Sequence, residues 1–518
     1  MIISHLSRFF FSPSRALRES ALPLAAVVLS LLAASAPANA ESFRNFYGLK
    51  FGATPFELRV QGPMQGLDVL HRWNQIAVDA SGLDHTPVAP GDPRHFGEQL
   101  GPARASRAMA IVHIAIFDSV NAIAGGYRSY TGITARGGAA SMDAAIAQAA
   151  HDTLSALFPS QKPAFDMLLA EDLLRISSRP QRENGIDAGK RVATAILAMR
   201  ANDGSATAES PLGSGPGSYQ TSDLAGHWRQ DPISQIPIAL GAHWGDCTPF
   251  VLQATTQFRT PPPPAMTSAA YAAAYNEVKS VGGDGIVTPT TRTADQTFAG
   301  LFWAYDGTPS LCAPPRLYNQ IAVQIADQQR LDTVRLARLL ALINVAMADT
   351  GMAAWESKFY WDFWRPITGI RESDPGTGPQ GLGDDNPATV GDPAFTPLGA
   401  PASNLTGPNF TPPFPAYPSG HAAFGGALFQ VFRRFYATDR VGFTFVSDEF
   451  NGVTRGNDGI MRPYMPRSFS TFSQAEEENG QSRIYLGIHW SFDKTEGIAQ
   501  GRRVADYVFD RVFTPLHP

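Results

Sequence analysis

Three short stretches in the C-terminal third of the chain carry the residues best suited to chemistry. They are Lys358 with the Arg365-Pro366 pair, Pro418-Ser419-Gly420-His421, and Ser482-Arg483 with His489 and Asp493. Cationic side chains, a hydroxyl and a glycine amide can surround a tetrahedral anion such as phosphate or vanadate, and histidines can do chemistry on it. The three stretches together predict an oxyanion site.

The first stretch is expected to present two cations from one helix. Lys358 and Arg365 are seven residues apart, so on a continuous helix they share nearly one face at a separation of about 10 Å. Both long side chains can then converge on one anion. Pro366 is expected to end this helix and to hold the arginine at a rigid terminus.

The second stretch lies where a loop gives way to a predicted helix. Helix N-termini offer free N–H groups and a partial positive charge to anions. Gly420 allows close approach of the backbone, and Ser419 adds a hydroxyl donor. His421 is then placed beside the anion, where an imidazole is suited to proton transfer.

The third stretch is expected to cross a helix end. Arg483 and His489 are six residues apart, which is not a same-face spacing, so the helix should end between them at Gly487. Asp493 can accept the N–H of His489 and leave the other ring nitrogen free. Asp493 can also cap the last helix, with Glu496 at the third helical position.

The motifs, in this order, resemble the superfamily shared by vanadium-dependent haloperoxidases and type 2 phosphatidic acid phosphatase-like acid phosphatases. Three longer strings resemble the chloroperoxidase-type haloperoxidases: Trp361-Asp-Phe-Trp-Arg-Pro366, Phe414-Pro-Ala-Tyr-Pro-Ser-Gly-His421 and Arg483-Ile-Tyr-Leu-Gly-Ile-His-Trp490. The length of 518 residues agrees, because soluble phosphatases of this superfamily are usually shorter. Vanadate bound to a histidine has the trigonal bipyramidal shape of a phosphoryl-transfer transition state, which links the two activities.

The resemblance implies a vanadate cofactor and assigns roles position by position. The expected oxyanion contacts are Lys358, Arg365, Ser419, Gly420 and Arg483. His489 matches the axial vanadium ligand, His421 matches the acid–base histidine that takes a proton from hydrogen peroxide, and Lys358 is expected to polarise the peroxide. Further out, Trp355 and Phe414 match aromatic positions on the halide side, with plain core packing as the alternative, and Asp306 resembles a carboxylate that pairs with Arg483.

The implied activity is oxidation of halide by hydrogen peroxide to hypohalous acid or to a halogenated organic acceptor. One alternative is an exported acid phosphatase in which His489 forms a phosphohistidine and His421 protonates the leaving oxygen. A second alternative is a non-catalytic oxyanion-binding protein. The contact residues alone do not separate the peroxidase from the phosphatase.

The elements that must position these residues are predicted to be helical. Apolar residues recur at three- and four-residue spacings in 104–123, and further helices are predicted at 67–80, 141–157, 161–176, 181–200, 268–281, 319–329, 332–364, 420–436, 469–488 and 494–512. No alternating run of β-branched residues predicts a strand. The short loops favour antiparallel neighbours, so we expect an all-α fold of two packed helical bundles, the C-terminal one holding the vanadate site.

Residues 41–265 are assigned to an N-terminal arm and helical bundle, and residues 266–518 to the C-terminal bundle. A Gly- and Pro-rich connection at 201–265 separates them. Residues 372–417 form a second long loop, and a loop of that length in a compact domain most often has a function such as lining a site.

Residues 1–40 have the features of a signal peptide: a basic start, an apolar run of about sixteen residues, and Ala38-Asn39-Ala40 as a cleavage site. Cleavage after Ala40 would give an exported protein, periplasmic or extracellular. No later segment is expected to span a membrane. The net charge of −5 argues against nucleic-acid binding, and large helical faces make a homodimer reasonable.

Two other sets of residues invite a functional interpretation. Cys247 and Cys312 are the two cysteines, and a disulfide or two separate buried thiols are both open. His113 and Asp118 share a predicted helix but lack a third ligand at helical spacing. We therefore expect them to be buried polar groups with internal partners.

Overall fold

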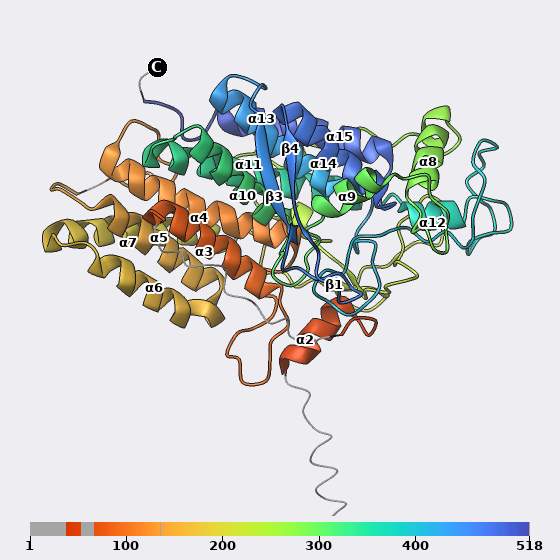
Figure 1. The fold of residues 1–518 in the computed structure, drawn as a ribbon, viewed down its shortest axis with the longest axis horizontal. Coiled ribbons are helices and arrows are strands. Elements are labelled where there is room, and N and C mark those ends of the chain that lie inside the picture. The colour runs from red at the N-terminus through yellow and green to blue at the C-terminus, as the bar shows by residue number, and fades with distance from the viewer. Residues whose placement is uncertain (1–37, 53–66, 135, 517–518) are drawn as a thin grey trace, which may run out of the picture. The chain divides into compact units, whose positions relative to one another are not determined.

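The computed structural model describes residues 38–52, 67–134 and 136–516, and residues 39–518 form one compact unit. The unit is mostly helical, as the sequence predicted (Figure 1). Its helices are α2 (Ala38–Tyr47), α3 (Val69–Asp84), α4 (Gly101–Ala124), α5 (Met142–Leu157), α6 (Lys162–Leu174), α7 (Arg179–Arg200), α8 (Ala269–Val281), α9 (Ala294–Phe302), α10 (Pro314–Gln328), α11 (Thr333–Trp361), α12 (Pro366–Arg371), α13 (Gly420–Tyr436), α14 (Phe472–Tyr485) and α15 (Ser491–Phe509). Short 3₁₀ turns lie at Pro159–Gln161, Trp244–Asp246 and Thr255–Phe258. The predicted signal peptide lies almost entirely outside the described residues.

Two small antiparallel ribbons correct the expectation of no strands. They are β1 (Ser210–Pro211) with β2 (Ile238–Ala239), and β3 (Phe443–Asn451) with β4 (Tyr464–Phe469). The inward positions of β3 are Phe443, Phe445, Ser447 and Glu449. Two of these are polar, so the apolar alternation is broken, and they are buried because Ser447 donates to Phe302 O at 2.6 Å and Glu449 pairs with Arg462.

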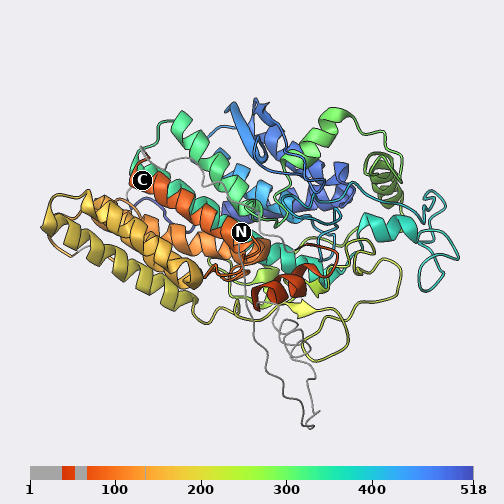
Figure 2. The ribbon, with the colours of Figure 1, turned by 60° about the horizontal axis from the view of Figure 1, so that its bottom comes forward.

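The N-terminal helices pack against one another, but α5 and α7 run parallel rather than antiparallel as predicted, because Gly185 lies against Ser141 and Gly189 lies against Ala145. Helix α4 packs on α5 and α7, and α5 packs on α6 and α7 (Figures 1 and 2). Ser141 caps α5 as predicted, because its hydroxyl accepts a hydrogen bond from Ala144 N at 3.2 Å. This part of the chain therefore forms the helical bundle expected from its short loops.

The longest helix, α11, lies between the N-terminal and C-terminal helices. It contacts α4 on one side and α13 and α15 on the other, as both ribbon views show. On length and composition alone, α4 and α11 are apolar enough to cross a membrane, which the sequence analysis had not expected. Their apolar windows are 83% and 100% buried within the protein, which is the burial of core helices. The assigned boundary near residue 265 stays a prediction.

Close packing of α13 on α15 sets the relative positions of two motifs. A Cβ at Gly501 would lie 2.0 Å from Ala423 O, so only glycine allows this approach. Helix α13 begins directly after Ser419, and α15 begins directly after Trp490. The contact between these helices therefore holds the second and third motifs against each other.

Residues 372–417 contain no helix or strand, as predicted. Isolated bridges join this loop to the rest of the chain at Gly283–Pro397 and within the loop at Ala400–Phe410. Its last residues run directly into the second motif. The loop is therefore tied down at several points before it reaches the site.

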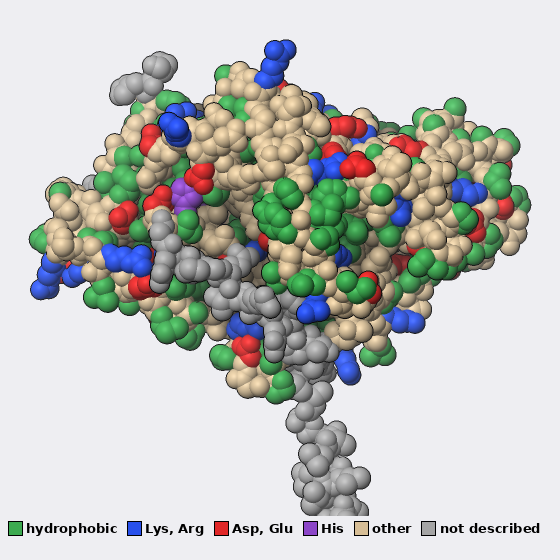
Figure 3. Space-filling model, viewed as in Figure 1, with side chains coloured by type: hydrophobic (Ala, Val, Ile, Leu, Met, Phe, Trp, Pro, Cys, Tyr) green, Lys and Arg blue, Asp and Glu red, His purple; other side chains and the backbone are tan. Residues whose placement is uncertain are grey.

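The two cysteines and the pair His113 and Asp118 are buried and contact other parts of the chain. Cys247 and Cys312 are free, buried thiols, and the Cys312 sulfur lies 2.8 Å from the Ser81 hydroxyl. His113 bonds Met109 O and the Asn74 side chain, while Asp118 accepts bonds from the segment 129–131. On the face drawn in Figure 3, charged side chains of both signs are interspersed.

Candidate oxyanion site

The first motif does not lie on one helix, contrary to the prediction. Helix α11 ends at Trp361, and Asp362 takes a left-handed conformation with φ 48°. The Asp362 carboxylate accepts hydrogen bonds from Tyr219 at 2.9 Å and from the ring of His227 at 2.8 Å, which holds the chain reversal in place. Pro366 then starts α12, where its missing N–H costs nothing, and Arg365 is the residue just before it.

Lys358 is fully buried and anchors the second motif. Its ammonium group donates to three backbone carbonyls, those of Pro415 and Ala416 at 2.9 Å and that of Pro418 at 2.5 Å. All three of its N–H bonds are therefore used by the segment that leads into Ser419. Lys358 shapes this segment and adds a positive charge beside it.

The two arginines approach the site with donors to spare. Arg365 donates to Phe414 O and Ile488 O, each at 2.9 Å, and Arg483 donates to Asp306 at 2.5 Å. The expected pair of Asp306 with Arg483 is therefore present. Arg365 Nη2 and Arg483 Nε and Nη1 are buried without a hydrogen-bond partner in the described chain. Buried, unpaired guanidinium groups are costly, so this corner is suited to an anion that accepts several hydrogen bonds.

His489 is held by a carboxylate on one side and faces Arg365 on the other. Its Nδ1 lies 2.8 Å from Asp493 Oδ2, and its Nε2 lies 2.9 Å from Arg365 Nη1. The arginine can only donate, so Nε2 carries the lone pair and Nδ1 carries the proton. Helix α14 ends at Tyr485 and Gly487 has φ 72°, which confirms the predicted break before this histidine.

Asp493 was predicted to be the N-cap of the last helix, but the N-cap is Trp490, and Asp493 caps the helix from its third position. Helix α15 starts at Ser491, three residues before the predicted start at Lys494, so Asp493 is its third residue. The carboxylate reaches back to accept the N–H of Trp490 at 3.0 Å while also accepting from His489. One oxygen thus serves both groups, and the other oxygen, Oδ1, is buried without a partner.

The second motif stands at the start of α13, as predicted. Ser419 is the N-cap, and its hydroxyl oxygen accepts from Ala422 N at 3.5 Å, which leaves the hydroxyl proton free to donate. The Ser419 N–H donates to Asp493 O at 3.0 Å. A Cβ at Gly420 would lie 3.2 Å from the Trp355 ring, so glycine keeps the backbone close to that wall.

His421 is fixed by backbone contacts that the sequence did not reveal. Its Nε2 lies 2.5 Å from Ala304 O and 4.0 Å from Asp306 Oδ1. The carbonyl accepts the ring N–H, so Nδ1 carries the lone pair. The His421 carbonyl in turn accepts from Asn479 at 2.9 Å and from Tyr318 at 3.0 Å. Asn479 lies one turn before Arg483 on α14, a same-face spacing that could have pointed to it, whereas no spacing relates Tyr318 to the motifs.

The electrostatics of the site reflect an excess of buried positive charge. Burial, followed by the charge of Arg365, holds the pKa of Lys358 well below its usual range. Burial and the nearby cations also lower the pKa of both His421 and His489. Burial raises the pKa of Asp493 to about 7 and raises that of Asp306 despite its pairing with Arg483. A bound oxyanion would offset this excess, and together with the unpaired donors this fits a vanadate-like group.

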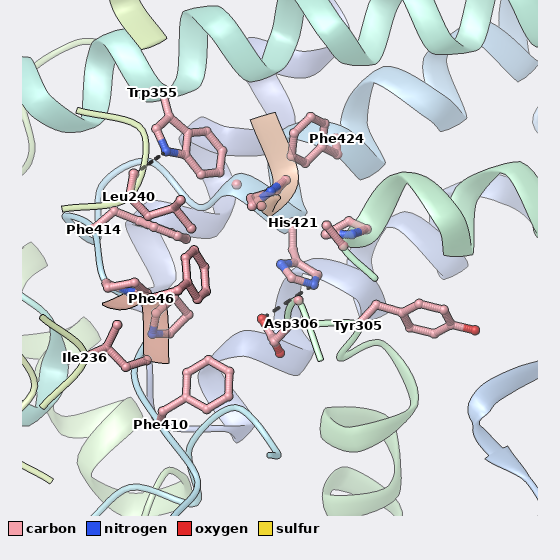
Figure 4. A pocket seen from close by; sticks show the side chains of 18 of the residues that line it. Phe46, Ile236, Leu240, Tyr305, Asp306, Trp355, Phe410, Phe414, His421 and Phe424 are labelled. Atoms are coloured by element: carbon pink, nitrogen blue, oxygen red, sulfur yellow. Dashed lines mark hydrogen bonds and ion pairs between the residues drawn. The ribbon is translucent and has the colours of Figure 1, made fainter. Parts of the chain in front are cut away.

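A pocket of ≈ 600 Å³, counted out to open solvent, adjoins the two histidines (Figure 4). The rings of Trp355 and Phe414 line it 4.9 Å apart, and Lys358 Nζ lies 5.1 Å from the Phe414 ring. The Trp355 N–H donates to Leu240 O at 3.0 Å. The two expected aromatic residues thus lie beside the cations. Other lining residues, which sequence reasoning missed, include Phe46, Tyr47, Ile236, Leu240 and Phe410.

The chain is mostly helical and buries a lysine, two arginines and two histidines close together, and both histidines line the pocket, so it has the composition of a helical-bundle protein suited to binding an oxyanion. Residues 338–518 match the family model described as the VCPO second helical-bundle domain. Vanadium chloroperoxidase of Curvularia inaequalis is 30% identical over 505 residues, covering 81% of this chain and 78% of that protein. The chain therefore belongs to the vanadium-dependent haloperoxidase family.

Two solved structures show the same fold at lower identity. The first bacterial vanadium-dependent iodoperoxidase is 22% identical, with a TM-score of 0.65 over 88% of this chain and all of that one. The apo-type bacterial vanadium-dependent chloroperoxidase is 16% identical, with a TM-score of 0.57 over 79% of this chain and 94% of that one. Both support the fold over most of the chain.

Proposed function

We propose that this protein binds vanadate and oxidises halide with hydrogen peroxide, giving hypohalous acid or a halogenated organic product. The observation that carries the proposal is the set of buried, unpaired donors of Arg365 and Arg483 next to the lone pair of His489. Bound vanadate would supply the Lewis acidity that activates hydrogen peroxide towards attack by halide. Membership of the family supports this assignment.

Some residues of the site are proposed to bind the anion through directed hydrogen bonds, and others only through their positive charge. Arg365 and Arg483 offer directed N–H donors, and the Ser419 hydroxyl and the N–H groups at the start of α13 add to them. His489 offers the lone pair of Nε2 as the metal ligand, and Asp493 fixes the ring that carries it. Lys358 contributes positive charge, because its N–H bonds are held by carbonyls.

His421 is the residue placed to move a proton. Its depressed pKa keeps the ring neutral near pH 7, and the contact with Ala304 O leaves Nδ1 as the free basic nitrogen. A neutral imidazole in this position can take a proton from hydrogen peroxide. Asp306, 4.0 Å from the same ring, can stabilise the imidazolium that results.

Trp355 and Phe414 are proposed to form the halide side of the site. Their rings form an apolar wall edged by the charges of Lys358 and Arg365, which lie 5.1 and 5.0 Å from the Phe414 ring. A halide anion is attracted by the cations, and the rings exclude the water that would compete with it. This arrangement gives the aromatic pair a use beyond core packing.

One experiment with two arms tests the function. Purified protein with and without added vanadate is given hydrogen peroxide, a halogen-trapping substrate and chloride, bromide or iodide, and separately an aryl phosphate. We expect vanadate-dependent halogenation with at least one halide. Phosphate-ester hydrolysis without vanadate, and no halogenation with it, would establish the acid phosphatase alternative, in which His489 is the nucleophile.

We also propose export of the mature chain after cleavage at Ala40, and a homodimer. N-terminal sequencing of secreted protein should begin at Glu41, and a cytoplasmic, full-length product would refute export. Light scattering of the purified mature protein gives the mass, and a single-chain mass would refute the dimer.

A further inference from the structure

We propose that the apolar part of the pocket binds the organic acceptor itself, as a small, uncharged phenol whose hydroxyl donates to Asp306. The proposal rests on the function proposed above, because the acceptor has a use only if the protein makes an oxidised halogen. It names the substrate class that the pocket selects, which the contact residues of the oxyanion site leave open.

The pocket has one polar end and one apolar end. Its lining residues with a carboxylate or imidazole side chain are Asp306, His421 and His489, and they lie together beside the proposed oxyanion contacts. The labelled side chains on the opposite side of Figure 4, including those of Phe46 and Phe410, are apolar. A charged acceptor would lose its hydration at that end without gaining a partner, which excludes it on energetic grounds.

The apolar end is a connected aromatic wall. The ring centroids of Phe46 and Tyr47 lie 4.9 Å apart, and the buried ring of Phe51, which does not itself line the pocket, links Tyr47 at 5.2 Å to Phe410 at 6.0 Å. These are the separations of favourable ring contacts, so the wall is already formed without a ligand. A halide ion needs only the short stretch at Trp355 and Phe414, so the rest of the wall is suited to a larger, planar molecule.

The hydrogen-bonding atoms of the pocket select a donor on the ring. The Tyr47 hydroxyl is already used, since it donates to Gly307 O. Asp306 Oδ2 is buried and has no hydrogen-bond partner in the described part of the chain, while Oδ1 is engaged by Arg483. An unpaired carboxylate oxygen at the edge of an apolar pocket fits a phenolic O–H, and it repels a group that can only accept.

The expected reaction is electrophilic substitution on the held ring. A ring carbon attacks the halogen of hypohalous acid, the carbon–halogen bond forms, and the oxygen–halogen bond breaks with its electron pair on oxygen. The displaced ring proton joins that hydroxide to give water. The ring is oxidised by two electrons and the halogen is reduced to the organic halide, so no further reagent is needed.

Binding tests the pocket independently of catalysis. Vanadate-free protein is titrated with phenol and with anisole, which has the same ring but no O–H donor, and binding is followed by ligand-observed NMR. We expect saturable binding of phenol at least about tenfold tighter than that of anisole, the ratio expected for one hydrogen bond to a carboxylate. Equal affinities, or no saturable binding of phenol, would overturn the proposal.

Two variants locate the binding to this wall. Phe46 is half-buried and removable, and Phe46→Ala should weaken phenol binding several-fold. Tyr464→Ala removes an aromatic side chain that is 66% exposed and does not line the pocket, so it should leave binding unchanged. Equal effects of the two variants, with both melting temperatures unchanged, would show that phenol binds elsewhere.

Product ratios test whether the bound phenol is the one that reacts. The ortho-to-para ratio of halogenated phenol from the vanadate-loaded enzyme should differ from that of added hypohalous acid, and Phe46→Ala should move it towards the reagent value. Identical ratios for enzyme and reagent would mean that halogenation occurs in solution. Tight phenol binding without any halogenation would instead refute the proposed function and leave the binding site standing.

Discussion

The oxyanion contacts and the apolar wall of the same pocket are built in different ways. Every proposed contact residue comes from the three motifs between Lys358 and Asp493, whereas the wall beyond Trp355 comes from α2, the 201–265 connection and the 372–417 loop. Contacts are directional, so residue type and spacing are both constrained. The wall needs only apolar bulk at the right place, which many sequences supply. The residues proposed for catalysis can therefore be predicted from the sequence, whereas the residues proposed to select the acceptor cannot.

The largest effect is expected from His489, the proposed vanadium ligand. His489→Ala removes the Nε2 lone pair and should abolish measurable vanadate binding and halogenation. Equilibrium dialysis with vanadate and the halogenation assay measure the two losses. His95→Ala, at a side chain that is 70% exposed, is the control and should behave as the parent. Retained vanadate binding in His489→Ala would show that the axial assignment is wrong.

A smaller loss of vanadate affinity is expected from changing Asp493, which contacts His489. Asp493→Asn keeps the size of the side chain but removes the charge that orients the Nδ1 proton of His489, so vanadate affinity should fall by roughly 10- to 100-fold. Asp458→Asn changes an exposed carboxyl and should leave affinity unchanged. If Asp493→Asn had the parental vanadate affinity and an unchanged melting temperature, Asp493 would have no role in vanadate binding.

Oxyanion binding should also depend on pH through the buried cations. The folded-state pKa of Lys358 lies below its unfolded value, so this lysine destabilises the anion-free fold below its folded pKa and ceases to do so as pH rises towards 10.5. A bound dianion removes that cost. We expect sulfate, whose charge is constant between pH 6 and pH 9, to raise the melting temperature more at pH 6, with about 2.7 kcal/mol of stabilisation at 100 times Kd.

Calorimetry gives the matching measurement. Because the anion restores the depressed pKa values of Lys358, His421 and His489, sulfate binding should take up protons, seen as a dependence of the binding enthalpy on buffer ionisation. Tighter binding at pH 9 than at pH 6, or proton release, would contradict the excess of positive charge at the site. Lys358→Met should reduce the proton uptake.

The smallest effect on the anion is expected from the wall. Phe410→Leu keeps an apolar side chain in a buried position and should change vanadate affinity by less than about threefold, with a stability cost below about 1.5 kcal/mol. Dialysis and thermal unfolding measure the two quantities. If Phe410→Leu weakened vanadate binding as much as Asp493→Asn, the claim that the apolar wall does not take part in anion binding would be wrong.

Local rules recovered much of the site from the sequence. The cap at Ser419, the helix end near Gly487 and the pair of Asp306 with Arg483 all follow from short-range preferences or from the family resemblance. The predictions that were wrong concern places where residues distant in the sequence determine the local structure. The reversal at Asp362 depends on Tyr219 and His227, more than a hundred residues away, and no pattern near Pro366 encodes it.

The fold shows the same limit. Helix positions were predictable from apolar spacing, but β3 was missed because Ser447 and Glu449 occupy two of its inward positions. Helix α15 was placed three residues late, since Asp493 has the residue type of a cap but acts from inside the first turn. Secondary structure predicted from apolar spacing is therefore wrong where buried polar residues form hydrogen bonds with partners distant in the sequence.

The proposed cleavage after Ala40 would change helix α2, which carries Phe46 and Tyr47 of the proposed acceptor site. The helix begins at Ala38, so cleavage after Ala40 would cut within its first turn and leave Phe46 five residues from the new, positively charged amino group of Glu41. Such a charge is unfavourable at a helix N-terminus. We therefore expect tagged, unprocessed and correctly trimmed forms to bind vanadate alike while differing in which acceptor they halogenate.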